Sequence, residues 1–414
     1  MRCQPRAAVL DLERAPVYAR VMTTAAPIAT TAAAPEEYTV LMLGTKGAGK
    51  TTFLASLYKC LRTQGDVGYF LKTASPTQQN ELQRRYQMIA DPNKDWPAGT
   101  TPAEDAAWGF SVSVNIRPRP GGRGQHDACR FSFYDYAGGR LTDDSLYSDE
   151  DFQQRMENAS ALFILVDGAK MLRVLEGHAD ELEYTLSELG RECECANNIG
   201  ALAHPVDFLL TKWDLLEAKG VSLDTVRNKL LEVQEVHNIV NERKKAGLSV
   251  RLIPVSSVGS GFVRPLDDGT MQKIPGKQPH PFLVETAFAC VIMDAVHAAV
   301  QRAEAKVAAE QKRQHELASR RPWWKRVFGE VVDALSEIVN IIAPKYKKLI
   351  RSVGRVLDVM HEADYDTKIH TLEEDRKQKL GALQDEHTAL EYVITCMGKQ
   401  IAELEHKFPA SRLA

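Results

Sequence analysis

The sequence lacks the features that would place the protein outside the ordinary globular class. Its 414 residues carry 52 Lys and Arg against 55 Asp and Glu, so no excess of positive charge suggests a nucleic-acid partner. The seven cysteines are scattered and contain no Cys-x-x-Cys pair, which argues against a zinc site or a disulfide framework. No segment holds about 18 uninterrupted apolar residues, so we expect no transmembrane helix. These absences predict a soluble, cytoplasmic protein with reduced thiols.

Residues 1–36 form an N-terminal segment that is rich in Ala, Thr and Pro. The segment has no uninterrupted apolar core of the kind that a secretory signal contains, so we expect a disordered tail. Its arginines leave organelle targeting as an alternative, against which Asp11 and Glu13 argue.

From Tyr38 onward, short apolar runs alternate with segments of helical spacing, and this order predicts an α/β fold. Runs such as 160–168 are apolar throughout, as a strand buried on both faces must be. Two runs flank a turn rich in Gly and Pro and predict an antiparallel pair, so the sheet should be mostly parallel, with one antiparallel strand and helices on its faces. We expect strands at 38–43, 107–118, 128–139, 160–168, 205–214 and 248–257, and helices at 51–63, after Ser75, at 170–196 and at 221–246.

The most specific motif is Gly44-Thr45-Lys46-Gly47-Ala48-Gly49-Lys50-Thr51, which matches G-x-x-x-x-G-K-[ST] at every fixed position. Its glycines let backbone N–H groups curl around phosphates, and the following helix adds its positive end. Lys50 would reach the β- and γ-phosphates, and the Thr51 hydroxyl would bind Mg²⁺. The motif predicts a P-loop NTPase fold, and the expected phosphate-binding residues are Gly44, Gly47, Ala48, Gly49, Lys50, Thr51 and Thr52.

A second motif, Thr211-Lys212-Trp213-Asp214, ends an apolar run and matches [NT]-K-x-D, the guanine-reading motif of Ras-like P-loop GTPases. The chain therefore resembles that family. The resemblance implies that the Asp214 carboxylate accepts hydrogen bonds from guanine while the Lys212 stem covers the ring. Adenine would leave the buried carboxylate unpaired, at a cost of roughly 1–3 kcal/mol. Ser256 and Ser257 stand where the family contacts the guanine oxygen, so the implied ligands are GTP and GDP.

Two further positions complete the resemblance. Asp135-Tyr136-Ala137-Gly138 matches D-x-x-G, in which the Asp holds Mg²⁺ and the Gly N–H senses the γ-phosphate. A switch threonine must precede it, and we favour Thr100 over Thr101. The resemblance implies GTP hydrolysis to GDP and phosphate by a molecular switch. The implied catalytic residues are Lys50, Thr100 and Gly138, and the implied metal ligands are Thr51, Thr100 and Asp135.

The sequence also departs from the family. Gly139 occupies the position of the glutamine that orients the attacking water, and Lys46 replaces a loop glycine close to the γ-phosphate. We expect slow hydrolysis unless a protein partner or a second copy supplies the missing group, with Arg140 as an alternative source in the same chain. The rival interpretation is a GTP-binding scaffold with negligible turnover. Within the family, residues 38–300 look most similar to the bacterial "double-GTPase" type.

The C-terminal region is predicted to be a helical arm behind a GTPase domain at 37–305. Residues 306–360 read as a basic amphipathic helical region, which would pack on another helix or lie on an anionic membrane surface as in a dynamin-like GTPase. Residues 361–410 show apolar spacings of three and four, typical of an α-helical coiled coil. This seam would close within the chain, against 300–320, or between two chains as a homodimer. The arm would engage an unidentified protein effector.

Overall fold

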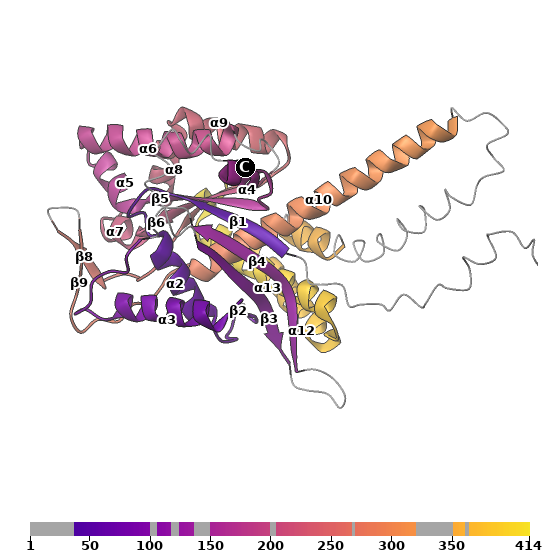
Figure 1. The fold of residues 1–414 in the computed structure, drawn as a ribbon, viewed down its shortest axis with the longest axis horizontal. Coiled ribbons are helices and arrows are strands. Elements are labelled where there is room, and N and C mark those ends of the chain that lie inside the picture. Colours follow the sequence, from indigo (N-terminus) through magenta and orange to yellow (C-terminus); the bar gives the residue numbers. More distant parts are fainter. Residues whose placement is uncertain are drawn as a thin grey trace, which may run out of the picture. The chain divides into compact units, whose positions relative to one another are not determined.

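The computed structural model describes residues 37–99, 106–116, 124–135, 150–198, 204–266, 270–319, 351–360 and 364–414. In these ranges a seven-stranded sheet has the order β2-β3-β4-β1-β5-β6-β7 (Figure 1). Only β3 runs against the other strands of this sheet, since it pairs antiparallel with β2 and β4 whereas the remaining pairs are parallel. The strands are β1 Glu37–Leu43, β2 Phe70–Thr73, β3 Ala106–Asn115, β4 Gln125–Asp135, β5 Ala161–Asp167, β6 Val206–Thr211 and β7 Val250–Pro254.

This architecture confirms the predicted fold class, a P-loop type of α/β fold with a mostly parallel sheet. All seven residues of β5 are buried, because helices cover both faces of the sheet. Side chains of β1 alternate between two cores, with Val40 and Met42 in one and Leu41 and Leu43 in the other. The edge strand β2 was not predicted, since "FLKT" is too short to show a period.

The first core lies between the sheet and α2 (Lys50–Leu61), α10 (Val284–Ser319) and α13 (Glu386–Lys407). The second core contains α4 (Glu150–Glu157), α5 (Gly168–Leu175), α6 (Ala179–Asn198), α8 (Leu223–Leu231) and α9 (Gln234–Lys245). Two helices predicted as continuous are therefore each divided. Gly177, whose φ is 85°, lies between α5 and α6, and a tight turn separates α8 from α9.

Four further elements complete this part of the fold. They are α3 (Pro76–Ala90), α7 (Trp213–Ala218) and the hairpin of β8 (Val263–Pro265) and β9 (Met271–Lys273). The Ser75 side chain accepts a hydrogen bond from the Gln78 N–H, which confirms the predicted cap of α3. The hairpin was not predicted from the sequence.

One stretch among the described helices, Val284–Arg302 of α10, is long and apolar enough to cross a membrane. Its apolar window is 78% buried, and side chains such as Phe288 and Val291 pack against the sheet. Burial in the core accounts for its composition.

The predicted coiled coil at 361–410 is corrected by the structure. The segment contains two helices, α12 (Tyr365–Ala382) and α13, and Asp385 begins α13 with a capping box that includes Thr388. The predicted seam residues Leu390, Ile394, Met397, Ile401 and Leu404 are buried in the first core, and α13 contacts β4, α10 and α12. A helix that covers a sheet shows the same three-and-four spacing as a coiled coil.

The predicted boundary at residue 305 falls inside α10, whose buried residues share the first core with α2 and α13. In the helical segment 351–360, Val353, Val356 and Val359 are buried in the core that contains α13. The tail at 1–36 and residues 320–350, which make up most of the basic amphipathic region, lie outside the described residues.

Candidate nucleotide-binding site

The phosphate-binding motif forms the loop between β1 and α2, as the P-loop fold requires. Gly47 and Gly49 have φ values of 87° and 95°, in the left-handed region that favours glycine. A Cβ at Gly44 would lie 3.0 Å from the Leu165 Cβ, so a larger residue would push the loop away from β5. The loop ends where α2 begins, so the free N–H groups of the first helical turn face the space that the loop encloses.

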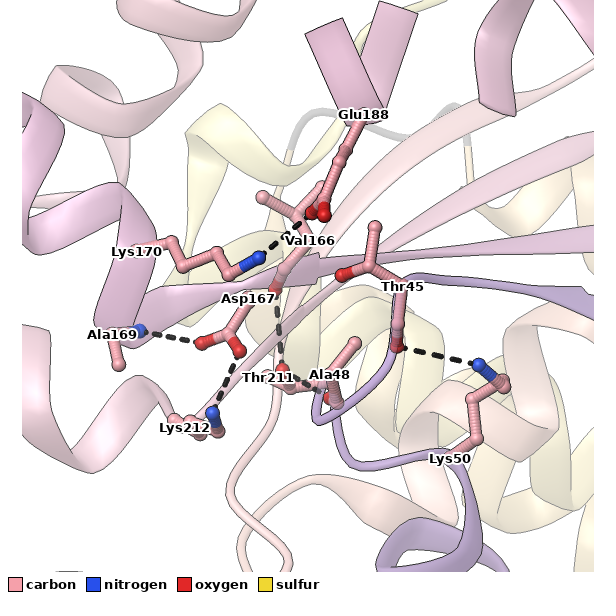
Figure 2. A network of polar contacts seen from close by, with 10 residues as sticks. All are labelled: Thr45, Ala48, Lys50, Val166, Asp167, Ala169, Lys170, Glu188, Thr211 and Lys212. Atoms are coloured by element: carbon pink, nitrogen blue, oxygen red, sulfur yellow. Dashed lines mark hydrogen bonds and ion pairs between the residues drawn. The ribbon is translucent and has the colours of Figure 1, made fainter. Parts of the chain in front are cut away.

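Lys50 is 7% exposed and is held inside this loop. Its ammonium donates to the Gly44 carbonyl. It also donates, over 3.4 Å, to the Thr45 carbonyl (Figure 2). Burial lowers the pKa of Lys50, and the nearby Asp135 and Glu192 carboxylates oppose that shift. A phosphate would offer this ammonium charged acceptors in place of neutral ones.

Thr51 and Asp135 meet beside the loop, with the Thr51 Oγ1 3.4 Å from an Asp135 carboxylate oxygen. Both side chains are buried, and Asp135 is the last residue of β4. Hydroxyl and carboxylate oxygens suit Mg²⁺, which takes few protein ligands when phosphates supply the others. No group of three or more His, Cys, Asp or Glu that could hold a metal ion is found among the described residues.

The motif predicted to read the base, Thr211-Lys212-Trp213-Asp214, begins at the end of β6 and is joined to the loop between β1 and α2. The Thr211 hydroxyl lies 2.8 Å from the Ala48 carbonyl and 3.2 Å from the Val166 carbonyl, and it donates to them (Figure 2). Lys212, with a φ of 53°, pairs with Asp167 at 2.7 Å. Asp167 also accepts from the Ala169 N–H and so caps α5. The role of Asp167 was missed, because its sequence neighbours give no sign of it.

Asp214 is fixed by the loop that follows β7. The Ser256 hydroxyl donates to the Asp214 carboxylate at 2.6 Å and accepts from the Gly259 N–H at 2.8 Å. Burial raises the pKa of Asp214, which is 6% exposed, whereas the Ser256 hydrogen bond acts to lower it. The Ser257 carbonyl accepts from the Ser56 hydroxyl of α2 at 2.8 Å, so this loop is tied to the helix that follows the phosphate loop.

A single cavity of about 410 Å³ joins these parts. The predicted residues that line it are Gly47, Gly49, Lys50, Thr51, Thr52, Asp135, Thr211, Lys212, Asp214, Ser256 and Ser257. Gly44 and Ala48 are not in its lining; Gly44 lies where an added Cβ would crowd Leu165, and the Ala48 carbonyl accepts from Thr211. Thr100 and Gly138 lie outside the described residues. The lining also includes apolar residues that sequence reasoning missed, namely Trp96, Pro97, Leu215, Val258, Val263 and Met271.

Two glutamates of α6 lie behind the phosphate loop and were also missed. Glu188 pairs with Lys170 at 2.7 Å (Figure 2), and Glu192 is 1% exposed and hydrogen-bonded by the Thr45 backbone. Burial raises the pKa of Glu192 to about 8, although Lys50 acts to lower it. Helical spacing marks this face of α6 as amphipathic, but it does not reveal that one glutamate is buried.

No model of a known protein family matches the sequence, and no curated protein matches it. Among solved structures, the chain is similar to one described as "Signal recognition particle receptor SRb-GTP/SRX complex" from Chaetomium thermophilum. The two sequences are 16% identical, the match covers 54% of this chain and 92% of the other, and the TM-score is 0.31.

Proposed function

We propose that this protein binds GTP together with Mg²⁺ and hydrolyses it slowly to GDP, so that the bound nucleotide sets the state of a molecular switch. One observation carries the proposal: the phosphate loop, the Thr51–Asp135 pair and the Asp214–Ser256 pair line the same cavity. A nucleotide has a phosphate end and a base end, and this cavity offers distinct partners for each.

Guanine is the base that the cavity suits. A carboxylate accepts hydrogen bonds, and guanine presents two neighbouring donors, its N1–H and its 2-amino group, on one edge. Adenine presents no such pair, so it would offer the Asp214 carboxylate no donors in place of those two. Lys212 is held by Asp167, which fixes its aliphatic stem beside the cavity.

The phosphate end supports Mg²⁺-dependent binding of a triphosphate. Thr51 and Asp135 would hold the ion, whose charge would offset that of the β- and γ-phosphates. Lys50 would exchange its loop carbonyls for phosphate oxygens, and the N–H groups at the start of α2 would face the same oxygens.

We propose that GTP hydrolysis is slow because of the sequence that follows Asp135. Gly139 has no side chain with which to orient a water molecule, and Lys46 lines the cavity where a small residue would leave room. We therefore propose that a partner protein accelerates hydrolysis. The second candidate function, a GTP-binding scaffold without turnover, depends on the same Gly139.

The first experiment measures the affinity of the purified full-length protein for GTP, GDP and ATP in the presence of Mg²⁺. We expect guanine nucleotides to bind at least tenfold more tightly than ATP, and Asp214→Ala to remove that preference. Asp224→Ala, on the exposed face of α8, is the matched control and should bind as the wild type does. Equal affinity for ATP and GTP would contradict the proposed function.

The second experiment follows phosphate release from saturating GTP in the same samples. Slow release that is lost in Lys50→Ala supports the GTPase. Guanine-selective binding without any release supports the scaffold instead. Fast unassisted turnover, on the order of 1 s⁻¹ or more, would contradict the need for a partner.

A further inference from the structure

An apolar wall closes the nucleotide cavity on the side of the loop that carries Ser256. It is formed by Trp96, which follows α3, and by Val263 and Met271 of the hairpin β8–β9. The Trp96 indole N–H donates to the Met271 carbonyl at 2.7 Å, so the ring has a fixed partner on the hairpin. The hairpin begins only a few residues after Ser256 and Ser257, which places the wall next to the base-reading loop.

Lys273 of β9 fastens the segment that carries Trp96. Although its side chain is charged, Lys273 is only 6% exposed. Its ammonium donates to the carbonyls of Met88 at 2.5 Å, Lys94 at 2.8 Å and Asp91 at 3.1 Å, and lies 3.5 Å from that of Asp95. Carbonyls at the C-terminal end of a helix such as α3 lack helical partners and carry partial negative charge, so a buried cation suits them.

The same ammonium lies 4.7 Å from the centre of the Trp96 ring, within cation–π distance. Behind the wall, Phe262 is buried with Ala55 of α2 and Ile89 of α3. The hairpin is thus anchored at its base, and the Lys273 ammonium links it to the turn after α3. Trp96 itself is half-buried and faces the cavity.

We propose that Trp96 and the hairpin β8–β9 form a nucleoside-binding wall, which contacts the base or ribose of the bound nucleotide, and that Lys273 is the residue that positions Trp96 in it. The proposal rests on the proposed function and extends it to residues that no motif identifies. An aromatic ring offers a base or a sugar a flat apolar surface, and contacts of this kind contribute substantially to nucleotide binding. Lys273 does not touch the nucleotide in this arrangement and acts through Trp96.

The test compares GDP with inorganic triphosphate, a ligand that lacks the nucleoside, in calorimetric titrations of the full-length protein with Mg²⁺. We expect Trp96→Leu and Lys273→Met each to weaken GDP binding about tenfold or more while leaving triphosphate binding unchanged. Lys273→Arg should retain most of the affinity, because a guanidinium also donates to several carbonyls. Lys277→Met, at an exposed position just beyond β9, is the matched control and should behave as the wild type.

Tryptophan fluorescence emission tests whether the nucleotide lies against Trp96. If Trp96 had only a structural role, GDP would not change its emission. We expect the change in emission that GDP causes in the wild type to be unaltered in Trp108→Phe and clearly reduced in Trp96→Phe, which retains a ring and should fold normally. Any change that remains in Trp96→Phe would come from Trp213, which lies between Lys212 and Asp214. GDP affinity that is unchanged in Lys273→Met and Trp96→Leu would overturn the wall while leaving the proposed function intact. Equal losses for GDP and triphosphate would also overturn it, since the effect would then belong to the phosphate loop. A wild type that binds no guanine nucleotide would overturn both proposals.

Discussion

The Thr211 hydroxyl lies 2.8 Å from the Ala48 carbonyl, a contact between residues 163 positions apart in the sequence. It joins the strand that carries the base-reading motif to the loop that would hold the phosphates. The Val166 carbonyl of β5 lies within 3.2 Å of the same hydroxyl, so one side chain connects three segments of the site. The two halves of the cavity are therefore positioned by a shared polar contact as well as by the sheet.

Replacing Thr211 by valine should destabilise the protein, because valine keeps the shape but leaves two buried carbonyls without their donor. We expect the free energy of unfolding to fall by about 1–3 kcal/mol, with weaker GDP binding. Urea denaturation and calorimetry would measure both. Thr211→Ser keeps the hydroxyl and should remain close to the wild type; equal loss in both variants would assign the effect to packing.

Replacing Ser256 by alanine should reduce base discrimination. The Ser256 hydroxyl both donates to Asp214 and accepts from the Gly259 N–H, so its loss frees the carboxylate and the loop together. We expect GDP affinity to fall about tenfold while the weaker ATP affinity changes little. Ser260→Ala, at an exposed position of the same loop, is the control. An unchanged preference for guanine in Ser256→Ala would show that the hydroxyl does not position Asp214.

Glu192 predicts a pH dependence of stability. Its pKa is about 8 in the folded chain and near 4.5 when unfolded, so between these values the folded state holds a proton that the unfolded state has lost. Stability should fall as the pH rises through this window, and Glu192→Gln should remove that part of the slope and be more stable than the wild type at pH 8. Denaturant titrations at pH 5, 6.5 and 8 would measure it. Glu194→Gln, on the exposed side of α6, should keep the wild-type slope.

The sequence predicted those parts of the site that depend on local geometry. The phosphate loop needs glycines at fixed spacings between a strand and a helix, and Asp214 follows an apolar strand at the edge of the sheet where the candidate cavity lies. Trp96, Lys273 and Glu192 could not be predicted in the same way. Their environment comes from contacts between distant segments, such as the Lys273 ammonium with the Met88 carbonyl, and no local pattern encodes these.

The same limit explains the prediction that was wrong. The apolar stripe of α13 indicates a helix with one buried face, but it does not say whether another helix or a sheet covers that face. In the structure, β4 and α10 lie against α13, and Tyr392 and Val393 are buried in the first core. The sequence did not reveal this arrangement, because α13 is far from β4 and α10 in the chain and the region between α10 and α13 was predicted to begin a separate helical arm.

Asp207 predicts a stabilising substitution in the second half of the sheet. The side chain is 1% exposed, and neither of its carboxylate oxygens has a hydrogen-bond partner among the described residues. Burial, reinforced by the nearby Asp294, raises its pKa well above 3.8, while Arg251 pairs with Asp294. The unfolded chain loses this proton at lower pH than the folded chain, so the wild type should lose stability as the pH rises above about 4.

Asp207→Asn should therefore be at least as stable as the wild type at pH 5 and more stable at pH 8. Thermal unfolding at the two pH values would measure the difference, with Asp224→Asn as the exposed control. A lower melting temperature for Asp207→Asn at pH 8 would show that the carboxylate is ionised and paired in the folded protein.

The position of α13 predicts that the α/β domain does not fold without the C-terminal residues. A chain that ends at residue 319 would expose the face of the sheet and of α10 that α13 covers, including the surroundings of Tyr69, whose hydroxyl donates to Gln400 at 2.7 Å. We expect this truncated chain to be insoluble or to lack a cooperative unfolding transition. Met397→Ala is a milder test of the same packing. This side chain is fully buried, so its truncation should lower the free energy of unfolding by about 2–5 kcal/mol. Glu403→Ala, on the exposed side of α13, should change stability little. A truncated chain that unfolds cooperatively and still binds GDP would instead restore the separate helical arm that the sequence suggested.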